Sequence, residues 1–209
     1  MAQQKRTWQQ LLPRLAAALA GAVVTGFGIH LILSSGVGVD PLTMFEEGLA
    51  RVLGLGTGTV VWWVNMTVLA LGALINRAKV GWGSLITALV IGPSVNLAAS
   101  LGLPVPGTLL SGIAVNLLGV AVVGLGIAIY MAADCGVGAM EIVMMFLADK
   151  THKSYGLIRV LMDCGWLVLG ILLGGTLGVG TVIGAFGIGI SMDLCYRGIT
   201  RLLWRKKRV

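Results

Sequence analysis

The chain has 209 residues, of which 57% are hydrophobic and 11% charged, and its mean hydropathy is +0.96. A soluble domain carries about 25% charged residues, so this composition excludes a soluble globular protein. The formal net charge of +7 does not indicate nucleic-acid binding, because the basic residues lie beside the ends of apolar segments. We therefore expect an integral membrane protein whose partner is the lipid bilayer and which has no nucleic-acid partner.

Six apolar segments approach the ~20 residues that cross a hydrocarbon core of ~30 Å. They are Leu15–Leu33, Thr59–Ile75, Trp82–Leu101, Thr108–Met131, Leu157–Leu173 and Gly178–Tyr196. If the N-terminus is cytoplasmic, nearly all lysines and arginines outside these segments fall on that side, and the opposite side keeps only Arg51. The positive-inside rule then predicts a multi-pass protein of the cell (inner) membrane with both termini in the cytoplasm.

The two halves of the chain resemble each other. A constant offset pairs Gly26 with Gly124, Gly28 with Gly126, Gly58 with Gly156 and Asn65 with Asp163, and the last pair is Asn96 with Asp193. Each half holds three apolar segments, and an odd number of crossings makes the second half enter from the opposite side. We predict an all-α membrane protein of six transmembrane helices in two inverted three-helix repeats, 1–104 and 105–209, forming one membrane domain.

A short amphipathic helix is predicted between the first and second spans. Asp40 is followed by proline, which is a strong helix start because the carboxylate accepts from free backbone N–H groups and proline fits the first position. The helix is expected to end at Gly54. Glu47 and Arg51 are one turn apart and can pair. One face carries Leu42, Phe45, Leu49 and Val52, and the other carries Thr43, Glu46, Glu47 and Arg51.

A second, more hydrophobic short helix begins near Ala139, after the fourth span. Both short helices are too short to span a bilayer. Each either lies in the interface on its amphipathic face or re-enters the membrane and hides its broken backbone in protein or a watery cavity. The glycines that precede the helices slightly favour a buried, re-entrant turn, because glycine permits positive φ and close backbone approach. These glycines are Gly36 and Gly38 in the first half and Gly136 and Gly138 in the second.

Polar and ionisable residues within the spans are candidates for a substrate site, because such groups are costly in a membrane. Arg159 and Asp163 lie one turn apart on the fifth predicted span. They form either a structural ion pair or, with Asn65, the lining of a pathway near the midplane, where Asp163 is the best-placed carboxyl for a coupling proton. Trp166 is a candidate cavity wall. Further candidates near the ends of spans are Asn96, Asp193 and His30.

Re-entrant helices would direct the free N–H groups of their N-termini into the membrane, where such groups attract anions. Asp40 and Glu141 lie near those ends and offset part of that field. A zwitterion or a cation therefore fits at least as well as an anion. No HExxH, GxSxG or GxxxxGK[ST] motif occurs, which argues against an enzyme. Two histidines and three cysteines without a CxxC pair indicate no metal site, and no cofactor motif is present.

The segments GVGVDP, from Gly36, and GWGSLITALVIGPSVNL, from Gly81, resemble the YczE/YitT-type family of bacterial integral membrane proteins. The resemblance covers most of the chain. Family members typically show G-x-G-P-W-D, whereas here Asp40 precedes the proline and the tryptophan is missing; Glu141 keeps the acidic spacing in the second copy. YitT-like members add a soluble C-terminal domain, so this chain is similar to the shorter YczE branch. The resemblance implies a membrane fold and location but no substrate.

The leading functional hypothesis is a transporter that moves a small polar or zwitterionic metabolite through a site between the repeats, near the midplane. A channel for a small solute and a membrane-embedded accessory or regulatory protein without transport are the alternatives. A wide, polar-lined site that includes Asp163 favours a carrier, a continuous narrow pore favours a channel, and a filled apolar centre favours the accessory role. The glycine-rich helix faces are compatible with a homodimer.

Overall fold

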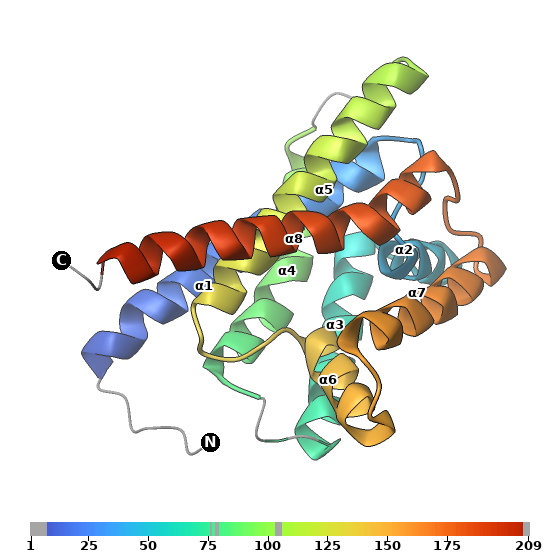
Figure 1. The fold of residues 1–209 in the computed structure, drawn as a ribbon. Helices are drawn as coiled ribbons and strands as arrows, with labels where there is room; N and C mark the ends of the chain where they lie inside the picture. Colours follow the sequence, from blue (N-terminus) through green and yellow to red (C-terminus); the bar gives the residue numbers. More distant parts are fainter. Residues whose placement is uncertain (1–7, 76, 78–79, 103–105, 207–209) are drawn as a thin grey trace.

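The computed structural model describes residues 8–75, 77, 80–102 and 106–206, and over these ranges the chain folds into helices without a β-strand. Figure 1 shows their arrangement. The helices are α1 (Trp8–Ser34), α2 (Pro41–Leu53), α3 (Thr57–Ile75), α4 (Trp82–Ser100), α5 (Leu109–Ala132), α6 (Ala139–Thr151), α7 (Tyr155–Leu172) and α8 (Val179–Lys206). The predicted boundary between the repeats, at residues 104 and 105, lies outside the described residues.

Five helices in the described part of the chain are long and apolar enough to cross a membrane: α1, α3, α4, α5 and α8. They contain five of the six predicted spans. The sixth predicted span, Leu157–Leu173, corresponds to α7, an 18-residue helix that is not among these five. It carries Arg159 and Asp163. The all-helical membrane architecture is therefore as predicted, with five such helices.

The element order of the first half recurs in the second. The offset that relates Gly26 to Gly124 also carries both ends of α2 onto both ends of α6, and the start of α3 onto the start of α7. The packing recurs as well: α1 packs on α4 as α5 packs on α8, and α2 packs on α7 as α6 packs on α3. The short helix of each half thus lies against a long helix of the other half.

The central pair of helices, α1 and α5, runs antiparallel. Gly28 in the middle of α1 faces Gly119 and Val123 of α5, whereas Arg14 near the start of α1 donates to the carbonyl of Ala133 (3.2 Å), just after the end of α5. A Cβ on Gly28 would lie 2.7 Å from the backbone nitrogen of Val123. The two backbones therefore approach as closely as small residues allow in membrane helix pairs.

The turns before α2 and α6 are each held by the last helix of the other half. The N–H of Gly180, in α8, donates to the carbonyl of Val37 at 2.8 Å, and the N–H of Gly83, in α4, donates to the carbonyl of Cys135 at 2.9 Å. The predicted turn glycines adopt positive φ next to these bonds, 69° at Gly36, 105° at Gly38 and 137° at Gly136. An L side chain rarely adopts this conformation, so the glycines make both turns possible.

Candidate functional site

The first short helix begins and ends as the sequence predicts. The side chain of Asp40 accepts from the backbone N–H of Thr43 (3.3 Å), and the following proline occupies the first turn. Gly54 ends the helix with φ 67°, the left-handed conformation that glycine favours at this position. Glu47 and Arg51 form the predicted ion pair at 2.6 Å. These local contacts fix where α2 starts and how it is rotated about its axis.

The polar face of α2 points into the protein. Thr43 and Glu46 are 3% and 2% exposed, whereas Val52 and Leu53 at the other end of the helix are 64% and 55% exposed. A carboxyl group buried in this way needs polar partners or takes up a proton, because an isolated buried charge costs several kcal/mol. The groups that surround Glu46 line a cavity.

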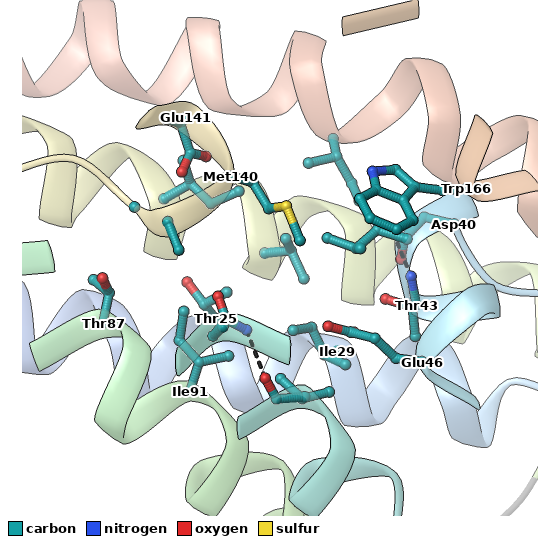
Figure 2. A pocket seen from close by; sticks show the side chains of 18 of the residues that line it. Thr25, Ile29, Asp40, Thr43, Glu46, Thr87, Ile91, Met140, Glu141 and Trp166 are labelled. Atoms are coloured by element: carbon teal, nitrogen blue, oxygen red, sulfur yellow. Dashed lines mark hydrogen bonds between the residues drawn. The ribbon is translucent and has the colours of Figure 1, made fainter. Parts of the chain in front are cut away.

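A cavity lies between the two halves, and all eight helices or the residues that cap them contribute to its lining. Its volume is about 100 Å³, which is small beside the pockets of roughly 300–1,000 Å³ that bind drug-sized ligands. Five charged residues line it: the carboxyl groups of Asp40, Glu46, Glu141 and Asp163, and the guanidinium group of Arg159. Figure 2 shows the α2 carboxyls at one end and Glu141 toward the other.

Arg159 and Asp163 are paired at one wall of this cavity. The Nε of Arg159 donates to Oδ2 of Asp163 at 3.1 Å, one helical turn away. Asn65, the counterpart of Asp163 in the first half, lines the same cavity and donates to the carbonyl of Val61 at 2.9 Å. Trp166, one turn beyond Asp163, is also in the lining. The ion pair predicted from the sequence is thus present, and both of its residues line the cavity.

Two carboxyl groups of the cavity lack a complete set of partners. Oδ1 of Asp40 and Oε1 of Glu46 are buried and accept no hydrogen bond from any described residue. Burial raises the pKa of Glu46 well above its usual value, and the nearby Asp40 carboxyl adds to this rise. Burial also raises the pKa of Asp40, while its hydrogen bonds to Thr43 oppose the rise. Unpaired buried oxygens of this kind cost about 1–3 kcal/mol each.

Glu141 lies in the first turn of α6, whereas Asp40 caps the start of α2. One oxygen of Glu141 accepts from the hydroxyl of Tyr130 (3.3 Å), and the other lies close to where a Cβ of Gly138 would be. A side chain at Gly138, whose φ is −62°, would therefore displace the Glu141 carboxyl. Carboxylates at helix N-termini are stabilised by the helix dipole, so each short helix presents one to the cavity.

The remaining predicted site residues lie outside the cavity. Asn96 donates to the hydroxyl of Thr59 at 3.1 Å, where α4 packs on α3. Asp193 forms an exposed ion pair with Arg197 at 2.8 Å on α8. His30 is partly buried on α1. The turn glycines Gly36, Gly38 and Gly136 shape the backbone before the short helices, as described above, and are absent from the cavity lining.

Several lining residues escape the sequence reading. Thr25, Thr87 and Tyr130 lie within apolar spans, and Glu46 lies on the polar face of α2. The counterpart of Glu46 in the second half is Met144, so no matched pair of carboxyl groups marks this position. A carboxyl group on a helix too short to cross a membrane is the signal that could have found it.

Residues 12–197 match the family of unknown function DUF6198. The chain is 27% identical to an uncharacterized protein of Haemophilus influenzae over 195 residues, which cover 93% of this chain and 88% of that protein. It is also 27% identical to the uncharacterized membrane protein YczE of Bacillus subtilis, over 88% of this chain and 86% of YczE. No solved structure matches. The predicted resemblance to YczE is confirmed: the chain is a YczE-like membrane protein that belongs to the DUF6198 family.

Proposed function

We propose that the protein is a transporter that binds a small polar or zwitterionic metabolite in the cavity between its two halves. The observation that carries this proposal is the set of charged groups around one enclosed space to which every helix contributes. Charged residues within membrane proteins are costly and line substrate or ion pathways. A site formed at the junction of two structural repeats is typical of secondary transporters.

The packing of the two halves supports an inverted arrangement. The equivalent helices α1 and α5 run antiparallel to each other, so a repeat whose first helix crosses the bilayer in one direction is matched by a repeat that crosses in the other. In this proposal α7 serves as the sixth span. The distribution of basic residues then assigns both termini to the cytoplasmic side of the inner membrane.

The short helices are proposed to re-enter the membrane rather than lie on its surface. An interfacial helix keeps its polar face in water and its apolar face in lipid. In α2 the polar residues Thr43 and Glu46 are buried and face the cavity, which is the arrangement that a re-entrant helix requires. The N-termini of α2 and α6 then meet the substrate with the carboxyl groups of Asp40 and Glu141.

A carrier fits the cavity better than a channel or an accessory protein. Five charged side chains, including that of Asp163, line a cavity whose wall is otherwise mostly apolar, and such a cluster of ionisable groups is expected of a carrier site. An accessory role would be favoured by a filled apolar centre. The proposal involves no enzymatic step, and since one chain supplies the whole cavity lining, it does not require a second copy.

Purified protein screened against metabolites by thermal shift, followed by flux measurements in liposomes for each ligand found, tests this function. Asp163→Asn is expected to abolish both the ligand-induced shift and the flux. Asp193→Asn is the matched control, because that residue is an exposed partner of Arg197, and it should keep both. If Asp163→Asn has a normal elution profile and unchanged binding and flux, Asp163 does not belong to the substrate site. If the wild-type protein binds a ligand but shows no flux, the transport function is wrong.

A further inference from the structure

The charge balance of the cavity is negative. Four carboxyl groups line it, but the only guanidinium there, that of Arg159, is paired with Asp163 at 3.1 Å. Asp40, Glu46 and Glu141 therefore have no positively charged partner in a hydrogen-bonded pair among the residues described. No lysine or histidine is among the described residues of the lining. Arg159 also attracts Asp40 and Glu141 electrostatically, so one guanidinium serves several carboxyl groups, and protons or a bound cation must offset the remaining charge.

Two of these carboxyls are also short of hydrogen-bond donors. Asp40 is 7% and Glu46 2% exposed, and Oδ1 of the first and Oε1 of the second accept no hydrogen bond from the described residues. Both side chains come from α2 and line the cavity. Figure 2 shows the Glu46 carboxyl extending toward the cavity, with Asp40 and Trp166 at the same end. Buried polar groups are almost always hydrogen-bonded or paired with a charge, so these oxygens indicate an N–H donor or a positive charge that a ligand supplies.

The rest of the wall suits a cation that carries apolar groups. The indole of Trp166 is held against the ring of Phe45, with ring centres 5.0 Å apart, and also lines the cavity. An aromatic face attracts an ammonium group, by about 2 kcal/mol or more when water is excluded. The lining also includes the polarisable thioethers Met140, Met144 and Met162, which adapt to the shape of alkyl groups.

We propose that this cavity binds a small organic cation, a protonated or quaternary amine, whose positive group lies between Asp40, Glu46 and the Trp166 ring. The inference rests on the proposed transport function and narrows its substrate. It departs from the zwitterion of the sequence reading because the guanidinium that would hold a carboxylate is already bound to Asp163. The substrate cation then takes the place of a proton at the α2 carboxyls.

Competition between the cation and a proton follows from the surroundings of Glu46. The charged and titratable groups that line the cavity with it are Asp40 on the same helix, Glu141 and Tyr130 across the cavity, and Arg159 and Asp163 on α7. Since burial and the Asp40 carboxyl raise the pKa of Glu46, the empty site holds a proton at acidic pH. Cation binding releases that proton, so affinity rises as the pH rises.

The ligand class is tested with four molecules of nearly the same shape on the purified full-length protein. Choline is the cation, 3,3-dimethylbutan-1-ol its neutral counterpart, betaine the zwitterion and 3,3-dimethylbutyrate the anion. A series of primary alkylammonium ions of increasing length covers other sizes. Choline or an alkylammonium ion is expected to raise the melting temperature, increasingly so from acidic to alkaline pH, whereas the neutral molecule and the anion are not.

Substitutions at the adjacent positions 46 and 47 distinguish a loss of ligand binding from a loss of folding. Glu46→Gln removes the charge with little change in size and should weaken cation binding by about tenfold or more, equivalent to ~1.4 kcal/mol, and flatten its pH dependence. Glu47→Gln is the control, because Glu47 binds Arg51 and Thr176 outside the cavity, and it should bind as the wild type does. Glu46→Asp retains the carboxyl and should bind better than Glu46→Gln if the latter is folded.

The outcomes distinguish this inference from the transport proposal. If betaine, the alcohol or the anion binds or is transported instead of the cations, the ligand class is wrong, and the transport function can still hold. Cation binding without flux would support the ligand class and contradict the transport function. If neither choline nor any alkylammonium ion stabilises the protein at any pH, or if Glu46→Gln binds as tightly as wild type, the inference is wrong.

Discussion

The α3–α4 contact in the first half and the corresponding α7–α8 contact in the second are packed differently. A Cβ on Gly58 of α3 would lie 2.5 Å from the carbonyl oxygen of Gly92 on α4, so these backbones nearly touch. Gly189 of α8 corresponds to Gly92, and a Cβ there would meet open space. Helix α7 packs mainly on α2 and contacts α8 little. One repeat is closed at this contact and the other is open.

Small residues alone therefore do not set the packing of these helices. Both halves carry glycine at the two equivalent positions of the contact, and small residues permit close approach without enforcing it. The closed contact also has a hydrogen bond from Asn96 to Thr59. In the second half, Asp193 takes the place of Asn96 and pairs with Arg197 on its own helix. Leu157 takes the place of Thr59 and cannot form this hydrogen bond. In the proposed transporter we expect one contact to open as the other closes, because alternating access moves one repeat against the other.

The largest expected effect is in cysteine cross-linking across the two contacts. In a chain with Cys135, Cys164 and Cys195 replaced, the pair Thr59→Cys and Asn96→Cys should cross-link almost completely with a short bifunctional thiol reagent, since the native side chains are 3.1 Å apart. The equivalent pair, Leu157→Cys and Asp193→Cys, should cross-link little in the resting protein. Mobility on a denaturing gel measures both.

Cross-linking during flux tests whether the closed and open contacts exchange between the two halves. During flux in liposomes, cross-linking of the α7–α8 pair should rise while that of the α3–α4 pair falls, and trapping either pair should stop flux. If both pairs cross-link equally at rest, the difference between the halves described above does not hold in the membrane. If neither pair changes during flux, the exchange is excluded.

A smaller effect is expected from adding one methyl group to each contact. Gly92→Ala places a Cβ 2.6 Å from the Cβ of Trp62, and overpacking of this kind costs about 1–3 kcal/mol. Its melting temperature in detergent should fall clearly below that of the wild type. Gly189→Ala meets nothing within 4 Å and should melt as the wild type does. Equal losses in the two variants would show that α7 and α8 also pack closely.

The smallest expected effect, a pH-dependent one, concerns the short helices. Glu46→Met copies the residue that the second half has at this position, Met144. Because the pKa of Glu46 is raised in the folded protein, its contribution to stability is present below its unfolded pKa and is lost as the pH rises through its folded pKa. Glu46→Met should therefore match the wild type at acidic pH and be more stable by about 1–3 kcal/mol at alkaline pH.

Chemical unfolding at several pH values measures this difference, and the same protein should no longer bind the organic cation. Glu47→Gln again serves as the control, with no comparable change in its pH dependence. A Glu46→Met variant that is less stable than the wild type at alkaline pH would mean that Glu46 has a favourable partner there.

Much of the local structure was predictable from the sequence, because it depends on residues close together in the chain. The cap at Asp40, the end of α2 at Gly54 and the pair of Arg159 with Asp163 all follow from spacings of a few residues. The internal repeat likewise predicted which helices correspond. Five long apolar helices followed from hydropathy.

The cavity could not be predicted in full, because it depends on how helices rotate and cross. Nothing in the spacing of Glu46 indicates that the polar face of α2 turns inward; that follows from the contacts of α2 with α3 and α7. The threonines on apolar spans, Thr25 and Thr87, look like ordinary packing residues until their helices are placed. The difference between the two helix contacts also arises only in three dimensions, since both carry the same glycines.

The hydrogen bonds that hold the two turns have a consequence for how such a chain could arise. The carbonyl of Val37 accepts from the N–H of Gly180, and that of Cys135 accepts from the N–H of Gly83. A polypeptide consisting of one half would lack these donors, which come from the other half. A second copy of the same half could supply them, as in a self-complementary dimer.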